Sequence, residues 1–301
     1  MVALTLLLPL LSGEGRTQSE ARSGFLKWQP IAPVAGSPLL FIVRAPAGVR
    51  SLSGRWMNHE ISFFQLAKDR SAHEIPSRRP SSWYALAGVP LETSPGYYQL
   101  KVTEVVAGGP REIVRKIRIG RGTYPKITVH VARQYTEPSP EQLREINADR
   151  NVKLRILATE NPVRLWRGPF VSPASASISD VFGTERIFNN EVQSHHLGLD
   201  YAVPIGTPVH AINRGVVLLA RPLYFEGNCV VLDHGQGLLS LYLHLSEFEV
   251  KEGDEVQSGQ AIGLSGGTGR ATGPHLHLAV RWQGVYLNPQ ALLKLTLPPG
   301  I

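Results

Sequence analysis

The sequence predicts an all-β protein with an N-terminal immunoglobulin-like β-sandwich, a short helical connector and a C-terminal antiparallel β-sheet domain. Short runs of β-branched and aromatic residues recur along most of the 301-residue chain, and 29 glycines and 23 prolines separate them. This alternation of strand-forming runs and turn residues is typical of β folds. Only one stretch, near the middle of the chain, combines a cap with the apolar spacing of a helix.

The chain begins with an apolar run, MVALTLLLPLLSG, which we interpret as a leader over residues 1–23. The run is too short to span a bilayer and resembles the apolar core of a secretory signal, although the usual basic residues before that core are missing. A buried N-terminal strand is the alternative. The signal interpretation predicts a periplasmic or secreted protein with no membrane span.

The β-sandwich is expected over residues 24–120. Strand-like segments alternate there with turn residues at the spacing of immunoglobulin-like folds: PLLFIVRAP, WYALAGVPL, GYYQLKVTEVV and EIVRKIRIG. The region lacks the paired cysteines of antibody domains, so the prediction depends on the strand pattern. Its histidines are scattered, and we expect no catalytic cluster in it.

Residues 121–168 are expected to form the helical connector. Ser139 is a candidate N-cap, Pro140 suits the first helical position, and Gln142 completes a capping box. Apolar residues at roughly helical spacing predict the packed face of this helix: Leu143, Ile146, Leu154 and Leu157.

The C-terminal domain is expected over residues 169–301. Seven of the ten histidines lie in it, which makes it the region to search for chemistry: His195, His196, His210, His234, His244, His275 and His277. The single cysteine, Cys229, excludes an intrachain disulfide and a cysteine-clustered zinc site. It lies within an apolar run, so we expect a buried structural thiol.

The first candidate motif is SHHLGLDYAVP, in which His196 and Asp200 are four residues apart with Gly198 midway. On a strand these three residues would point to one face, and the glycine would leave room between the two side chains. An imidazole and a carboxylate that converge are suitable ligands for a divalent metal. A salt-bridged surface pair is the alternative.

The second motif is PHLHLAV, in which His275 and His277 would share a strand face while leucines occupy the other. The alternative is an ordinary polar face of a half-buried strand. In LYLHLSEF, Tyr242 and His244 alternate with leucines, so both would lie on the polar face of a third strand. A structural histidine is the alternative for His244. The spacing leaves open which of His275 and His277 binds a metal.

Together these motifs suit a catalytic zinc site. Two histidines and an aspartate fill three positions of a tetrahedral zinc ion and leave the fourth for water. Zinc lowers the pKa of such a water to about 7 and polarises a substrate carbonyl. Of the remaining two histidines, one can take the proton of the water and the other can steady the oxyanion. Such an arrangement hydrolyses peptide bonds.

Residues from about 178 to 292 resemble the lysostaphin-type (LytM-type) zinc metalloendopeptidases, which cut bacterial peptidoglycan peptides. The motifs HLGLD, YLHL and GDEVQSGQAIGLSGGTGRATGPHLH occur in the family's order. The resemblance implies that one Zn²⁺ per chain is held by His196, Asp200 and His277. It also implies that His244 and His275 are catalytic residues outside the zinc shell. The expected activity is hydrolysis of peptidoglycan cross-links, in cell-wall remodelling or lysis.

Some relatives in this family lose ligands and regulate or activate other cell-wall hydrolases, which is the alternative function. The complete set of five residues favours an enzyme. Three further histidines of the domain, His195, His210 and His234, are expected to be structural. The glycine run GLSGGTGRATG lacks the Gly-Lys-Ser/Thr order of a phosphate loop, so we expect a turn there.

Charge is unevenly distributed along the chain. Residues 1–169 carry 24 lysines and arginines against 13 acidic residues, whereas residues 170–301 carry 7 against 11. The basic half is either a solvated surface or a site for an anionic partner such as a cell-envelope polymer or nucleic acid, and a carbohydrate- or nucleic-acid-binding module is a further alternative. No lysine-rich block or aromatic-basic stripe of an RNA reader occurs, so no nucleic-acid partner is expected. The resemblance implies peptidoglycan peptides as the partner.

Overall fold

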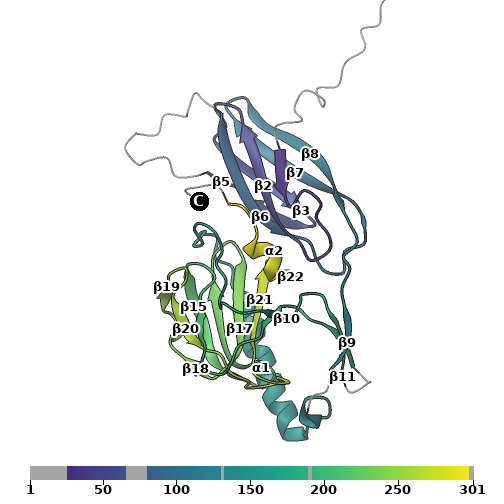
Figure 1. Ribbon diagram of the computed structural model, residues 1–301. Helices are drawn as coiled ribbons and strands as arrows, with labels where there is room; N and C mark the ends of the chain where they lie inside the picture. Colours follow the sequence, from purple (N-terminus) through teal and green to yellow (C-terminus); the bar gives the residue numbers. More distant parts are fainter. Residues whose placement is uncertain (1–25, 66–79, 130–131, 189–191, 298–301) are drawn as a thin grey trace, which may run out of the picture.

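The computed structural model describes residues 26–65, 80–129, 132–188 and 192–297 (Figure 1), and the predicted leader lies outside these ranges. The described chain contains two β-rich parts and two α-helices, which confirms the all-β prediction. Among the described residues, no helix has both the length and the apolar character needed to cross a membrane.

The N-terminal part consists of two four-stranded antiparallel sheets. The first has, in spatial order, the strands β1 (Leu26–Gln29), β2 (Pro38–Ala45), β6 (Ser81–Gly88) and β5 (Phe64–Gln65). The second has β4 (His59–Ser62), β3 (Ser51–Trp56), β7 (Gly96–Val106) and β8 (Gly109–Ile119).

The two N-terminal sheets are joined through Trp56 of β3, which is fully buried. Its ring meets that of Phe41, on β2, edge-on at a centroid distance of 5.6 Å. Its indole N–H donates to the carbonyl oxygen of Gly88, on β6, at 2.8 Å. Aromatic burial with a satisfied indole N–H is a strong packing arrangement. The immunoglobulin-like classification of this part stays a prediction.

The chain between the two β-rich parts forms β9 (Lys126–Val129), the 3₁₀ turn η2 (Arg133–Tyr135) and helix α1 (Pro140–Leu157). The predicted capping box is confirmed: the backbone N–H of Gln142 donates to Ser139 Oγ at 3.2 Å, and that of Ser139 donates to Gln142 Oε1 at 2.8 Å. The helix therefore begins where its sequence predicts.

The predicted packed face of α1 is partly wrong. Leu143 and Leu154 are 46% and 62% exposed, whereas Val152 and Ile156 pack with Leu157 against the C-terminal sheet. The helix meets the sheet only along its second half, so which residues are covered depends on where the sheet lies. The periodicity of the helix alone did not contain that information.

The C-terminal part is built on an eight-stranded sheet. Its strands, in spatial order, are β10 (Ile178–Asp180), β13 (Leu199–Tyr201), β21 (Leu276–Trp282), β17 (Leu238–Leu245), β16 (Gly227–Asp233), β15 (Gly215–Leu223) and β19 (Glu255–Val256), with β22 (Val285–Leu287) also paired to β21. Helix α2 (Pro289–Leu293) follows β22.

Two small sheets flank this one. The first contains β14 (Pro208–His210), β20 (Ala261–Leu264) and β18 (Glu247–Phe248). In the second, β11 (Glu185–Phe188) lies between β12 (Val192–His195) and the connector strand β9, with which it pairs in parallel. The connector thus contributes a strand to the C-terminal part (Figure 1).

The two faces of the large sheet pack differently. On β21, the side chains of Leu276, Leu278 and Val280 are fully buried in the main core. Ala279, between them, belongs to a smaller apolar cluster that α1 covers, and this cluster also contains Cys229, whose thiol is buried as predicted. Residues of β21 an even number of positions from Ala279 therefore face the α1 side of the sheet.

The N-terminal sheets rest on the β21–β22 hairpin. The ring of His59 lies 5.1 Å from that of Trp282, and Gln283 Nε2 donates to the carbonyl oxygen of Glu60 at 2.8 Å. Figure 1 shows these sheets at one end of the molecule and α1 at the other.

Candidate metal centre and active site

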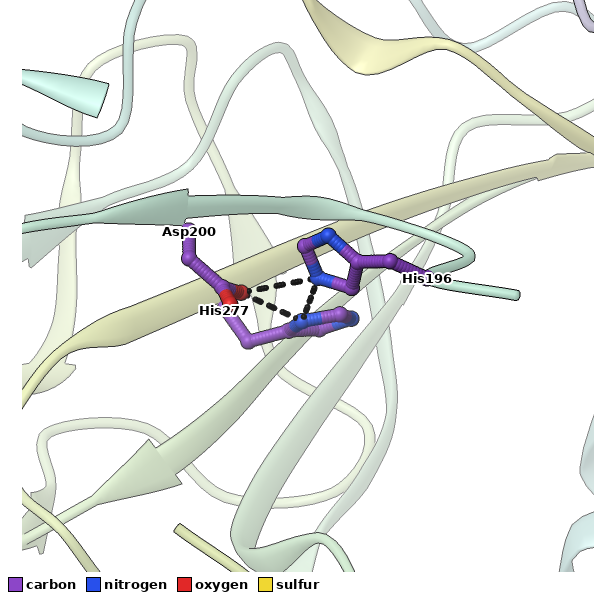
Figure 2. A group of neighbouring side chains, drawn as sticks. All are labelled: His196, Asp200 and His277. Atoms are coloured by element: carbon purple, nitrogen blue, oxygen red, sulfur yellow. Dashed lines mark hydrogen bonds and ion pairs between the residues drawn. The ribbon is translucent and has the colours of Figure 1, made fainter. Parts of the chain in front are cut away.

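Three polar side chains predicted as metal ligands meet beside the β13–β21 pair (Figure 2). His196 Nε2 lies 3.0 Å from Asp200 Oδ1, and His277 Nδ1 lies 2.7 Å from the same oxygen. The two ring nitrogens are 3.0 Å apart. Asp200 and His277 are direct neighbours in the strand register, so the pairing of β13 with β21 brings them together.

The expectation that His196, Gly198 and Asp200 share one strand is wrong. Strand β12 ends at His195 and β13 begins at Leu199, so His196 and Gly198 lie in the turn between them. The turn still points the His196 ring toward Asp200. The Nδ1 atom of His196 lies 2.9 Å from the carbonyl oxygen of Val181, so the opposite ring nitrogen, Nε2, faces the carboxylate. A nitrogen facing a carbonyl must carry the hydrogen, which leaves Nε2 with its lone pair toward the centre.

Gly198 is needed for close approach. A Cβ atom at this position would lie 2.4 Å from Cε1 and Nε2 of His277. The glycine therefore makes room for the imidazole of His277, whereas the sequence predicted room between His196 and Asp200. With Nε2 turned toward Gly198, the other ring nitrogen, Nδ1, faces Asp200 and His196.

The protonation states at this centre suit a metal ion. Burial opposes the charge of Asp200, but the close contacts of its carboxylate with the imidazoles of His196 and His277 hold the pKa of this carboxyl well below the usual range. Burial lowers the pKa of His277, although its hydrogen bond to Asp200 opposes the shift. A carboxylate and a neutral imidazole are the forms that bind metals. The donor set of two nitrogens and one oxygen fits zinc with one position left open.

The two predicted non-ligand histidines lie next to this centre. The rings of His244 and His275 are 4.8 Å apart, and that of His244 is 6.1 Å from His277. Their Nδ1 atoms lie 2.8 Å from the carbonyl oxygens of Thr268 and Gly273, respectively. Each Nδ1 therefore carries the hydrogen, and each ring keeps its Nε2 lone pair free to accept a proton or a hydrogen bond.

Strand β17 does not alternate in the predicted way. Tyr242, expected on the polar face with His244, is fully buried, and its hydroxyl accepts the backbone N–H of Ile212 at 2.8 Å. Leu243, expected on the opposite face, is paired with His277 and lines the cleft. Simple alternation from Tyr242 would turn the side chain of His244 into the core.

A β-bulge redirects His244. Between the pairs Val230–Tyr242 and Asn228–Leu245, β17 contains one residue more than β16. His244 has a φ of +65°, a left-handed conformation that is strained for a non-glycine residue. Bulges next to active sites commonly re-aim a side chain. Here the bulge places two consecutive residues, Leu243 and His244, on the cleft side.

Burial, together with the nearby rings of His277 and His275, lowers the pKa of His244 to about 3. His244 is therefore neutral at physiological pH. His275 lies just before β21 at the wall of the cleft, and its Nε2 is 4.0 Å from Asp200 Oδ2.

The five side chains line one cleft with a volume of about 600 Å³. Its walls come from the β11–β12 hairpin, the β15–β16 turn, the loop before β21 and helix α1. Lys153 of α1 binds Glu226 Oε1 at 2.6 Å, and both line the cleft. The docked helix thus closes one side of the cleft.

Two charged residues at the centre were not predicted from the sequence. Arg186 Nη2 binds Asp180 Oδ2 at 2.5 Å and Asp200 Oδ2 at 2.7 Å. Asp180 Oδ2 also lies 3.3 Å from His196 Nδ1. An aspartate and an arginine six residues apart, as Asp180 and Arg186 are, have no distinctive spacing in the sequence.

The histidines predicted to be structural lie outside the ligand group. His234 is fully buried, with Nδ1 2.8 Å from the carbonyl oxygen of Arg214 and Nε2 2.7 Å from Ser240 Oγ. His210 Nδ1 lies 3.2 Å from the carbonyl oxygen of Pro173. His195 lines the cleft but points its Nδ1 toward the carbonyl oxygen of Gly183, at 3.4 Å.

Residues 194–289 match the model of peptidase family M23. This range contains the three candidate ligands and both further histidines. The chain carries a peptidase family M23 domain. The resemblance drawn from the motifs is thereby confirmed.

Sequence relatives share mainly this M23 domain. The chain is 48% identical over 103 residues to the peptidoglycan DD-endopeptidase ShyA of Vibrio cholerae, which covers 34% of this chain and 23% of ShyA. It is 47% identical over 94 residues to the DD-carboxypeptidase/endopeptidase Mpg of Neisseria meningitidis, covering 31% of this chain and 22% of Mpg. The chain therefore spans less than a quarter of the length of these curated relatives.

A solved structure resembles the chain more broadly. The crystal structure of a putative peptidase M23 from Pseudomonas aeruginosa superposes with a TM-score of 0.63 and is 28% identical in sequence. The similarity covers 87% of this chain and 95% of that one. It therefore extends to the N-terminal sheets as well as to the M23 domain.

Proposed function

We propose that this protein is a zinc-dependent endopeptidase that hydrolyses peptide cross-links of bacterial peptidoglycan. The observation that carries the proposal is the convergence of five side chains on one cleft. Two histidines and an aspartate offer three ligand atoms, and two more histidines present free Nε2 atoms beside them. This is the composition of a hydrolytic metal site with an open coordination position.

His196, Asp200 and His277 would hold the zinc ion. Bound there, zinc would lower the pKa of a water molecule to about 7 and polarise the substrate carbonyl. The chain's own residues supply the proton transfers. Because burial disfavours the protonation of His244, His275 is the ring assigned to take the proton of the attacking water and return it to the leaving amine.

His244 then has an orienting role. Its Nδ1–H is committed to Thr268, so its Nε2 accepts a hydrogen bond from the water or from the substrate amide. In this protonation state it has no hydrogen left to donate to an oxyanion, which separates its role from that of His275. The strained backbone that holds it supports a functional placement.

The substrate class is proposed from the relatives. ShyA is named a peptidoglycan DD-endopeptidase and Mpg a DD-carboxypeptidase/endopeptidase, and both are similar to the part of this chain that contains the cleft. Peptidoglycan lies outside the cytoplasm, so we place the protein in the cell envelope, periplasmic or secreted. The segments 24–120, 121–168 and 169–301 are proposed as sandwich, connector and catalytic domain.

The test is digestion of purified sacculi by the full chain, followed by mass spectrometry of the released muropeptides. We expect new peptide ends from the wild type, none after chelation, and recovery when zinc is restored. His277→Ala should abolish both zinc binding and digestion. Digestion by His277→Ala at the wild-type rate would overturn the site. Zinc binding without digestion would favour the regulator of other hydrolases.

A further inference from the structure

The two oxygens of Asp200 have separate partners. Oδ1 faces the ligand atoms of His196 and His277, at 3.0 and 2.7 Å. Oδ2 accepts a hydrogen bond from Arg186 Nη2 at 2.7 Å. The Asp200 side chain is only 7% exposed, and its Oδ2 also lies 4.0 Å from His275 Nε2.

Arg186 is itself fixed from the opposite side. Its Nε and Nη2 both donate to Asp180 Oδ2, at 3.0 and 2.5 Å. The other oxygen of Asp180 accepts the backbone N–H of Val181 at 2.9 Å, so this carboxylate cannot rotate freely. A planar guanidinium held by two carboxylates has little freedom to move.

The strand that carries Arg186 is also restrained. Arg186 lies in the middle of β11, which pairs with β12 on one side and with the connector strand β9 on the other. The backbone N–H of Glu185 donates to the carbonyl oxygen of Pro125 at 2.8 Å, and Lys126 Nζ binds Glu185 Oε1 at 2.8 Å. Asp180 and Arg186 both precede residue 194, where the M23 match begins.

We propose that Arg186 is a positioning residue that makes Asp200 bind zinc through one oxygen only. This inference rests on the proposed zinc site. A carboxylate can bind a metal through one oxygen or through both, and binding through both would crowd the position that water needs and raise the coordination number from four to five. By holding Oδ2, Arg186 leaves only Oδ1 available and keeps that position open.

The same group reaches a second ligand. Asp180 Oδ2, which binds Arg186, also lies 3.3 Å from His196 Nδ1. The carbonyl oxygen of Val181 lies 2.9 Å from the same Nδ1 atom. Asp180 therefore orients Asp200 through Arg186 and contacts His196 directly. Partners of this kind, which hold metal ligands without binding the metal, change metal affinity by about 10–100-fold when they are removed.

The experiment compares Arg186→Gln, Arg186→Lys and wild type in the full chain. Zinc affinity is measured by competition with a chromogenic chelator, and the coordination number by the visible absorption of the cobalt-substituted protein. We expect Arg186→Gln to bind zinc roughly 10–100-fold more weakly. Its cobalt spectrum should lose intensity, because five-coordinate cobalt absorbs less than four-coordinate cobalt. Arg186→Lys should restore part of the zinc affinity and of the cobalt absorption, since lysine keeps the positive charge but lacks the planar guanidinium that binds both carboxylates.

Arg221→Gln is the matched control. Arg221 makes a two-bond pair with Glu252 on the surface of the same domain, at 2.8 and 2.7 Å. This variant should keep wild-type zinc affinity and the wild-type cobalt spectrum. Circular dichroism of the chelated proteins checks that each variant is folded, and Arg186→Lys serves as the test if Arg186→Gln does not fold.

The outcomes separate this inference from the proposed function. Wild-type affinity and an unchanged cobalt spectrum in a folded Arg186 variant would overturn the positioning role and leave the zinc site intact. A wild type that binds no zinc would overturn both proposals. A wild type that binds zinc but digests no sacculi would overturn the proposed peptidase activity. The zinc affinity and cobalt spectra of the Arg186 variants would still test the positioning role.

Discussion

Replacement of Gly198 by alanine is expected to disrupt the metal centre without touching a ligand. The added Cβ would lie 2.4 Å from two atoms of the His277 ring and 2.6 Å from the carbonyl oxygen of Leu278. Ordinary carbon contacts are about 3.5–4.0 Å. The imidazole would therefore have to move by roughly 1 Å, because the neighbouring backbone of β21 is held in the sheet.

That displacement is large for a ligand. On its other side His277 Nδ1 is 2.7 Å from Asp200 Oδ1 and 3.0 Å from His196 Nε2, so a shift of the ring disturbs all three residues. Metal–ligand distances tolerate only about 0.2 Å of variation. We expect zinc affinity to fall by at least about 10–100-fold. Hydrolysis at saturating zinc should fall by about 10²-fold, and overpacking should cost about 1–3 kcal/mol of unfolding free energy.

The assay measures zinc affinity by chelator competition, sacculus hydrolysis at saturating zinc, and thermal unfolding of the chelated protein. Gly267→Ala is the control, since a Cβ there meets its nearest neighbours at 3.8 Å, an ordinary contact. Wild-type zinc affinity and activity in Gly198→Ala would refute the placement of His277 against this glycine as a metal ligand.

Three further results are expected. Burial lowers the pKa of His234 to about 4, so the unfolded chain binds more protons between pH 4 and 6.5. Stability should therefore fall by about 3 kcal/mol as the pH drops through that range. A His234→Gln variant that retains the full acid loss in denaturant titrations would contradict this. His275→Ala should lose about 10²–10⁴ in kcat at unchanged zinc affinity; a parallel loss of zinc would make His275 a ligand. Lys153→Met should destabilise the protein by about 1–3 kcal/mol, because the partly buried carboxylate of Glu226 loses its lysine partner, and Glu226→Gln should relieve the loss in the double variant. Additive melting shifts would show that the pair is uncoupled.

Short-range spacing accounts for most of what the sequence determined. His196, Gly198 and Asp200 lie within five residues, and His275 and His277 within three, so local geometry alone limits which side chains can meet. The capping box of α1 is equally local, and the structure has it where the sequence predicts. The all-β class followed from recurring strand and turn signals, each of which spans fewer than a dozen residues.

The tertiary structure decided the remainder. The side of β17 to which His244 points depends on a bulge against β16. Strand periodicity assumes a regular ladder, so it wrongly placed Tyr242 on the same face as His244. Arg186, which binds Asp200, lies on β11 between β12 and the connector strand β9, and the Lys126–Glu185 pair of β9 and β11 is 59 residues apart in sequence. The position of the large sheet likewise determines which face of α1 is buried. Residue type and local spacing can be read directly from the sequence. Bulges, strand order and the packing of α1 on the sheet depend on contacts between segments that are distant in sequence.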